Sequence, residues 1–209
     1  GRAVYCGFDP TADSLTIGNL VPIMLLAHFQ RAGHTPVVLM GGGTGLIGDP
    51  SGKTAERQLR TREEVDANVR AQRRIFQQIL SFDQHAPNCA KMVNNADWLC
   101  AIGYLDMLRD VGKHFSVNMM IQKESVKERL HNREQGISYT EFSYMILQAY
   151  DYLVLWRDHA AHGIPQPVTV QCGGSDQWGN MVGGSDLIRR VFAADHPELR
   201  EDASRAPAH

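Results

Sequence analysis

Residues 2–40 read RAVYCGFDPTADSLTIGNLVPIMLLAHFQRAGHTPVVLM, and this stretch decides the fold. Its pattern predicts a short apolar strand from Arg2 to Phe8, a helix from Gly18 to Ala32 and a second strand from Pro36 to Met40. Gly33 follows the helix, where glycine commonly ends one. Two buried strands joined by a helix indicate parallel neighbours with a right-handed crossover.

The same alternation continues along the chain. Further strands are expected at Ala90 to Asn94 and Val168 to Cys172. Further helices are expected at Thr61 to Leu80, where Thr61 and Glu64 form a capping box, at Thr140 to Ala160, and at Ser175 to Ala194 with Ser175 as its cap. The predicted fold class is α/β: a Rossmann-like parallel sheet with helices on both faces.

The region from Ala96 to Arg133 is predicted to be helical without a strand, so we expect a helical insertion at about 96–133 on one edge of the sheet. Ligands of such sheets bind at the carboxyl ends of the strands. Three polar or glycine-rich segments fall there, at residues 6–19, 41–53 and 171–177.

Composition narrows the class of protein. With 209 residues and 43% hydrophobic content, the chain can build one sizeable core. A formal net charge of −2 argues against a protein that coats DNA or RNA through bulk positive charge. No apolar run approaches the roughly 20 residues of a membrane span. The chain lacks an initiator Met and ends on a polar tail, so we interpret residues 1–209 as one catalytic-type domain truncated at both ends.

The cysteines predict neither a zinc site nor a disulfide framework. Cys6, Cys89, Cys100 and Cys172 are scattered, and no two form a C-x-x-C pair. Scattered cysteines in a chain of this size fit a reducing cytosol, and we expect a cytoplasmic protein.

The glycine-rich loop imitates two nucleotide-binding motifs. Gly43-Thr-Gly45-Leu-Ile-Gly48 fits G-x-G-x-x-G, but the turn-forming Asp49-Pro50-Ser51-Gly52 follows where a dinucleotide fold needs a helix. Gly52-Lys53-Thr54 resembles the end of a P-loop, but position 47 is Ile where that motif needs Gly. We therefore predict neither a dinucleotide fold nor a P-loop. Asp49, at the edge of the loop, is well placed to hold an ammonium group.

Five blocks in order resemble the tyrosyl form of the class I aminoacyl-tRNA synthetases. Together they span roughly Arg2 to Phe192. The blocks are Tyr5 to Asn19, Gly45 to Lys53, Val111 to Asn118, Tyr139 to Tyr144 with Gln148 to Asp151, and Gly173 to Asn180.

Two features depart from that family. Its signature usually reads H-I-G-H, whereas this chain has Thr16-Ile-Gly-Asn19, a form that also occurs in the related tryptophanyl enzymes. The family's K-M-S-K-S-type loop lies beyond His209 in the family's order. The resemblance therefore predicts the amino-acid side of the site more firmly than the phosphate side.

For the amino acid, the resemblance implies that Tyr5 and Asp151 hold the hydroxyl of tyrosine. It assigns the α-ammonium to Asp49, Tyr144 and Gln148, with Asn95 and Gln171 in support. Positions 144, 148 and 151 share one helix face, which equally fits a polar face of an amphipathic helix. Because that helix is largely apolar, polar groups on it need partners, and a ligand is one candidate.

For ATP, the resemblance implies ribose contacts at Cys6 and Asp176 and room for adenine at Gly18. Gly7, Gly173 and Gly174 allow close approach of the backbone. Gln177 is expected near the reacting carboxylate, and Asp9 either holds the ammonium or orients the turn. The candidates for phosphate are Thr11, Thr16 and Lys53, and Asn19 is the candidate for the nucleotide. The alternative for the two threonines is that they cap the helix at Gly18.

The resemblance also implies partners. They are L-tyrosine, ATP with Mg²⁺, tRNA(Tyr) and a second copy of the chain, which docks through the insertion. Arg189 and Arg190 are candidate contacts for the tRNA. No metal held by the protein itself and no DNA partner are expected. Two alternatives stay open: a tryptophanyl enzyme, which Thr16 and Asn19 would suit, and a non-catalytic RNA-binding relative.

Overall fold

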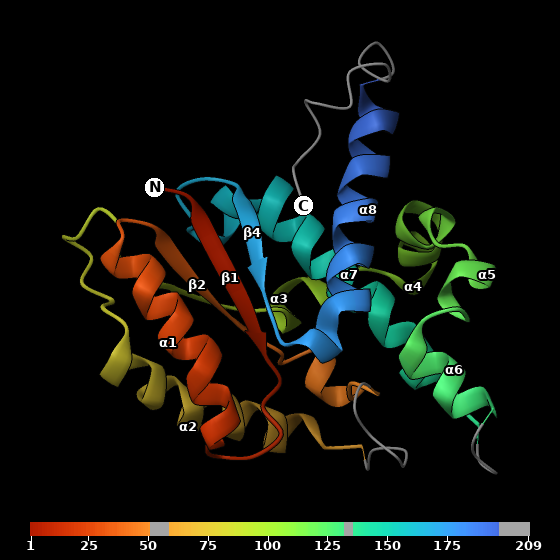
Figure 1. Cartoon of the computed structure of the whole chain (residues 1–209), viewed down its shortest axis with the longest axis horizontal. Helices are drawn as coiled ribbons and strands as arrows, with labels where there is room; N and C mark the ends of the chain where they lie inside the picture. The colour runs from red at the N-terminus through yellow and green to blue at the C-terminus, as the bar shows by residue number, and fades with distance from the viewer. Residues whose placement is uncertain (51–58, 132–135, 197–209) are drawn as a thin grey trace.

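The computed structural model of this chain describes residues 1–50, 59–131 and 136–196 (Figure 1). Four strands form one sheet: β1 (Ala3–Phe8), β2 (Thr35–Met40), β3 (Lys91–Asn94) and β4 (Val168–Cys172). Their order is β3-β2-β1-β4, and all three pairings are parallel. The predicted Rossmann-like sheet is confirmed. The chain steps outward from β1 to β3 and then crosses to β4, which creates a topological switch point between β1 and β4.

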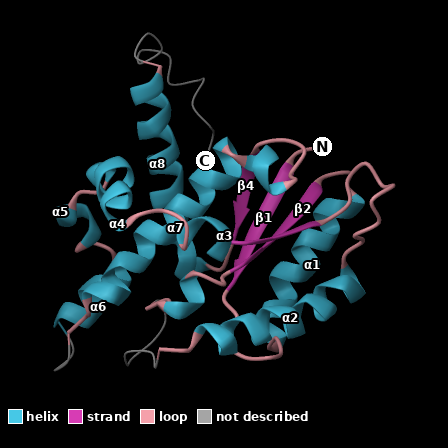
Figure 2. Ribbon diagram, turned by 180° about the vertical axis from the view of Figure 1, so that it is seen from behind, coloured by secondary structure: helices cyan, strands magenta, loops and turns pink. Residues whose placement is uncertain are grey.

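Helices cover both faces of the sheet (Figures 1 and 2). Helices α1 (Ile17–Arg31) and α2 (Arg62–Ile79) lie on one face, and α7 (Tyr139–Arg157) and α8 (Trp178–Asp195) lie on the other. Side chains of a strand alternate between faces. In β1, Val4 and Cys6 therefore join the core beneath α1 and α2, whereas Tyr5 joins the core beneath α7 and α8.

The ends of the helices test two sequence predictions. Thr61 and Glu64 form the expected capping box at the start of α2. The predicted cap at Ser175 is wrong, because Ser175–Gln177 form a separate 3₁₀ turn and α8 begins only at Trp178.

The described part of the predicted insertion, residues 96–131, contains helical turns and no strand. These are α3 (Ala96–Leu99), α4 (Tyr104–Asp106), a π-helical turn (Met107–Val111), a 3₁₀ turn (Gly112–His114), α5 (Val117–Met120) and α6 (Glu124–His131). A small cluster of Met120, Val126 and Met145 packs α5 and α6 against α7. Within the described residues, no helix is long and apolar enough to cross a membrane.

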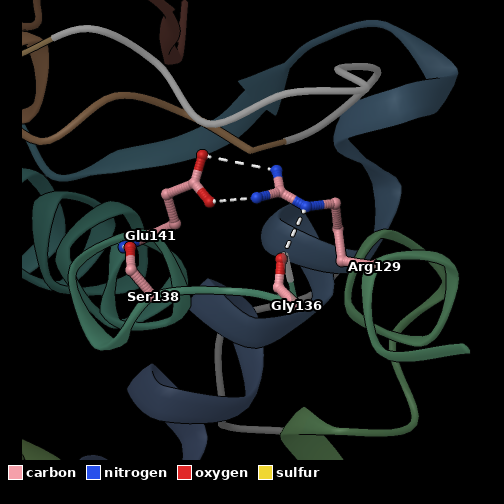
Figure 3. A network of polar contacts seen from close by, with 4 residues as sticks. All are labelled: Arg129, Gly136, Ser138 and Glu141. Atoms are coloured by element: carbon pink, nitrogen blue, oxygen red, sulfur yellow. Dashed lines mark hydrogen bonds and ion pairs between the residues drawn. The ribbon is translucent and has the colours of Figure 1, made fainter. Parts of the chain in front are cut away.

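A buried ion pair joins α6 to the first turn of α7 (Figure 3). Nη2 of Arg129 lies 2.7 Å from Oε2 of Glu141, and the two side chains are only 3% and 2% exposed. Nε of Arg129 also donates to the carbonyl of Gly136 at 3.2 Å, and the backbone N–H of Glu141 donates to Oγ of Ser138. This network anchors the helix that carries Tyr144, one turn after Glu141.

Candidate active site

A cavity of about 530 Å³ opens at the carboxyl ends of β1, β2 and β4, at the switch point of the sheet. Its wall combines the loop after β1, the glycine-rich loop after β2, one face of α7 and the loop after β4. Most of the residues predicted from the sequence lie in this wall: Tyr5, Cys6, Gly7, Asp9, Thr11, Gly18, Asn19, Asp49, Asn95, Tyr144, Gln148, Asp151, Gln171, Gly173, Gly174, Asp176 and Gln177.

Of the residues predicted for the amino acid and ATP, two are not in this wall. Thr16 precedes α1 and is exposed; its N–H and its hydroxyl both donate to Oδ1 of Asn19 at 2.9 Å. This is the cap-like arrangement that the sequence left open for Thr16. Lys53 lies outside the described residues.

At the deep end of the cavity, the hydroxyl of Tyr5 is buried without a hydrogen-bond partner among the described residues. Tyr5 is only 1% exposed, and its ring lies 5.3 Å from the ring of Tyr152. Burial, with the nearby Asp151 as a smaller cause, raises the pKa of Tyr5 well above its usual value. The hydroxyl therefore stays protonated and is available to a ligand, since a buried hydroxyl without a partner is costly.

The carboxylate of Asp151 is held by two donors beside Tyr5. Nδ2 of Asn95 donates to one oxygen at 2.9 Å, and the indole Nε1 of Trp98 donates to the other at 2.7 Å. Burial raises the pKa of Asp151 from 3.8 to about 7, although both donors act in the opposite direction. Each carboxylate oxygen can accept a second hydrogen bond, so Asp151 can still receive a ligand hydroxyl.

A chain of hydrogen bonds continues from Asn95 across the cavity wall. Asn95 donates to Oγ1 of Thr44 at 3.0 Å, and that hydroxyl donates to Asp9 at 2.7 Å. The hydroxyl of Tyr144 donates to the other oxygen of Asp9 at 2.8 Å. A Cβ atom at Gly41 would clash with both Asp9 and Thr44, so this tight packing requires glycine at the start of the loop.

Nearer the opening, Gln177 joins the loops that follow β2 and β4. Its Nε2 donates to Asp49 at 2.8 Å and to Asp176 at 3.0 Å. Of the described residues that line the cavity, four are aspartates and none is lysine, arginine or histidine; the aspartates are Asp9, Asp49, Asp151 and Asp176. Such a wall attracts an ammonium group, whereas phosphate groups need counter-charges from elsewhere.

Two glutamines on the wall have buried oxygens without partners among the described residues. They are Oε1 of Gln148, on α7, and Oε1 of Gln171, on β4. Together with the Tyr5 hydroxyl they face one cavity from the α7 side of the sheet. Unsatisfied polar atoms that converge in this way are typical of a site shaped for a small polar ligand.

Among the residues at the site that sequence reasoning missed, three carry polar or thiol groups. Trp98 holds Asp151, Thr44 links Asn95 to Asp9, and Cys172 lies in the wall beside Cys6. Trp98 lies three positions after Asn95, a spacing that could have indicated a shared helix face. Nothing local in the sequence pairs Thr44 with Asp9, because their contact depends on how β1 and β2 lie together.

The sequence of this chain is similar to curated proteins over most of its length. A tyrosine–tRNA ligase of Syntrophus aciditrophicus is 55% identical over 189 residues, which are 90% of this chain and 41% of that protein. A tyrosine–tRNA ligase of Streptococcus mutans is 55% identical over 186 residues, or 89% of this chain and 42% of that protein. The chain thus spans about two-fifths of the length of these curated relatives.

Solved structures show the same architecture. The C-terminally truncated mitochondrial tyrosyl-tRNA synthetase of Aspergillus nidulans superposes with a TM-score of 0.79 at 28% identity, over 92% of this chain and 54% of that one. The tyrosyl-tRNA synthetase of Archaeoglobus fulgidus, solved with L-tyrosine, has a TM-score of 0.66 over 91% of this chain and 51% of that one; at 19% identity it supports the fold alone. Residues 2–199 match the family described as tRNA synthetases class I (W and Y), and this chain belongs to that family.

Proposed function

We propose that this chain is the amino-acid- and nucleotide-binding part of a tyrosine–tRNA ligase. In the first step, a carboxylate oxygen of L-tyrosine attacks the α-phosphorus of ATP, which enters with Mg²⁺, and pyrophosphate leaves. In the second step, a terminal ribose hydroxyl of tRNA(Tyr) attacks the carbonyl carbon of tyrosyl-adenylate, and AMP leaves. Neither step needs a protein nucleophile, so the site acts by positioning and by stabilising charge.

The observation that carries this proposal is the pair formed by Tyr5 and Asp151. The buried hydroxyl of Tyr5, which has no hydrogen-bond partner among the described residues, lies near a carboxylate that two donors hold in place. A phenol can accept a hydrogen bond from Tyr5 and donate one to Asp151. Phenylalanine would leave the Tyr5 hydroxyl unsatisfied, at a cost of about 1–3 kcal/mol, and would donate no hydrogen bond to Asp151.

The remaining roles follow from charge and position. Asp49, Tyr144 and Gln148 suit the α-ammonium, with Asp9 and Gln171 beside them in the same wall. Asn95 acts through other residues, since its amide is engaged by Asp151, Thr44 and the N–H of Gly43. We therefore assign Asn95 to positioning Asp151 rather than to the ammonium.

ATP is proposed to lie toward the loops after β1 and β4. Cys6, Asn19 and Asp176 line that part of the wall, together with Gly7, Gly18 and Gly174, and Thr11 and Gln177 lie near them in the chain. Because the described wall lacks cationic side chains, the phosphates need Mg²⁺ and basic residues from other parts of the protein; Lys53 is one candidate. Arg189 and Arg190 on α8 remain candidates for contact with tRNA.

The decisive experiment is pyrophosphate exchange by the full-length protein with tyrosine, phenylalanine or tryptophan as the amino acid. Exchange should depend on tyrosine, with phenylalanine weaker by orders of magnitude. Exchange driven best by tryptophan would support the tryptophanyl alternative. No exchange together with no tyrosine binding in calorimetry would support a non-catalytic RNA-binding relative.

A homodimer through the helical insertion is part of the proposal. Large apolar side chains of the insertion and of the start of α7 are exposed: Tyr104, Leu105, Leu108, Val117, Met119 and Tyr139. Clustered exposed apolar groups mark interfaces. Leu105→Asp should convert a dimer to a monomer in analytical ultracentrifugation, whereas Asp97→Asn should not.

A translation enzyme with free cysteines is expected in the cytoplasm.

A further inference from the structure

Two cysteines from distant parts of the sequence lie opposite each other in the sheet. Cys6 of β1 is the register partner of Cys172 of β4. Both side chains belong to the core on the α1 face, so they project to the same side of the sheet. Neighbouring strands are about 4.8 Å apart, which brings two such side chains within reach of one bridging atom.

The same two cysteines are in the wall of the active-site cavity. Both are free thiols; Cys6 is buried and Cys172 is partly exposed. The other two described cysteines are not in that wall: Cys89 is buried in the core, and Cys100 is exposed at the end of α3. A small reagent that enters the cavity therefore meets a pair of thiols, whereas the other cysteines are met singly.

The geometry points to a dithiol site, formed by Cys6 and Cys172, that captures thiophilic electrophiles able to form two sulfur bonds, with trivalent arsenicals as the representative class. In the reaction, an arsonous acid R–As(OH)₂ exchanges two As–O bonds for two As–S bonds. Each thiol proton leaves with a hydroxyl as water, so two waters are released. Arsenic stays trivalent, and no oxidant or reductant is needed.

The two thiols are expected to bind arsenic(III) but to react slowly in alkylation and peroxide oxidation, because both are protonated. Burial raises the pKa of Cys6 to about 12 and also raises the pKa of Cys172. Because the thiolate is the nucleophile in alkylation and in peroxide oxidation, both cysteines should react slowly with iodoacetamide and hydrogen peroxide. Capture of arsenic(III) has a thermodynamic advantage instead, since the second As–S bond forms within the same complex.

The site does not depend on the proposed enzymatic activity, although its occupation should block the cavity. The test is titration of the full-length protein with phenylarsine oxide, followed by intact-mass measurement and a count of the remaining free thiols. We expect one arsenical held by the Cys6 and Cys172 peptides together. An excess of a small dithiol should reverse the binding, whereas a monothiol should not.

Two variants make the outcome decisive. Cys172→Val should weaken retention of the arsenical about 10²-fold, the typical advantage of linked binding over single binding. Cys100→Ala, which removes an exposed single thiol, should leave retention unchanged. Equal retention by the Cys172→Val variant, or mapping of the arsenical to Cys89 or Cys100, would overturn the proposal. Because binding is read by mass, failure here is distinguishable from failure of pyrophosphate exchange.

Discussion

The indole Nε1 of Trp98 donates a 2.7 Å hydrogen bond to the carboxylate of Asp151, which lies 53 residues later in the chain. This contact ties the short helix after β3 to the long helix α7 at the deep end of the cavity. Together with the hydrogen bond from Asn95, it holds the carboxylate in place near Tyr5. The contact makes Trp98 a positioning residue for the proposed recognition of the phenol.

Trp98→Phe should weaken tyrosine binding by about 10- to 100-fold. The substitution removes one of the two donors that hold the Asp151 carboxylate, and a hydrogen bond to a charged group contributes about 1.5–3 kcal/mol. Loss of that donor should also raise the pKa of Asp151 further. Tyrosine affinity measured by calorimetry from pH 6 to pH 9 should therefore show its pH midpoint moved upward.

Trp156→Phe is the matched control, because Trp156 packs edge-on against Phe192 and is not in the cavity wall. Its affinity and pH midpoint should match those of the wild type. Equal losses of affinity in both variants, with the pH midpoint unchanged, would mean that Trp98 only supports the fold.

Tyr5→Phe should reduce the preference for tyrosine over phenylalanine without destabilising the protein. The kcat/KM ratio for the two amino acids in pyrophosphate exchange should fall about 10- to 100-fold, the equivalent of one hydrogen bond to substrate. The free energy of unfolding should stay the same or rise by about 1 kcal/mol, because the removed hydroxyl is unsatisfied among the described residues. ATP binding should change little.

Tyr152→Phe provides the comparison for Tyr5, since the two rings are neighbours but Tyr152 is not in the cavity wall. It should keep the preference for tyrosine. An unchanged preference in Tyr5→Phe would refute the role given to Tyr5.

Asp151→Asn should flatten the pH dependence of stability. Burial raises the pKa of Asp151 from 3.8 to about 7, so the native protein binds this proton more tightly than the unfolded chain does. The resulting stabilisation is complete below about pH 4 and is lost as the pH rises toward 7. Over that window the wild type should lose about 4 kcal/mol relative to Asp151→Asn, at 1.36 kcal/mol for each pKa unit.

Urea unfolding at a series of pH values from 4 to 8 measures this difference. The diagnostic quantity is the slope of the free energy of unfolding against pH. The absolute values also change, because the amide nitrogen of Asn at position 151 must face either Asn95 or Trp98 and so lowers stability at every pH. The exposed Asp97→Asn variant should follow the wild-type slope. Parallel curves for Asp151→Asn and the wild type would contradict a raised pKa.

Glu141→Gln should destabilise the protein by about 3–5 kcal/mol, because it leaves the buried charge of Arg129 without its counter-ion. Replacing both residues with Met should recover most of that loss, since the desolvation cost of the pair also disappears. Denaturant unfolding measures both effects. The exposed pair of Arg109 and Asp110 is the control: Arg109→Ala should cost less than about 1 kcal/mol. Similar losses at the two pairs would contradict this account.

Much of the fold could be predicted because the signals are local. The strands and helices follow from the spacing of apolar residues within a few turns, and the Thr61–Glu64 cap follows from two residues three positions apart. The prediction of the start of α8 was wrong. Ser175 is a residue type that commonly caps helices, yet Ser175–Gln177 form a 3₁₀ turn and α8 begins only at Trp178. Most residues of the cavity wall were found through motifs that occur as contiguous blocks.

The sequence by itself determined the α/β alternation, the family and the set of polar residues from which a site could be built. Only the tertiary structure decided which of those residues meet. Tyr144 reaches Asp9 across 135 positions, and Cys6 lies beside Cys172, because the parallel sheet brings the carboxyl ends of β1, β2 and β4 to one edge. Whether a buried polar side chain finds a hydrogen-bond partner depends on this arrangement of the strands, because the partner comes from a distant segment of the chain.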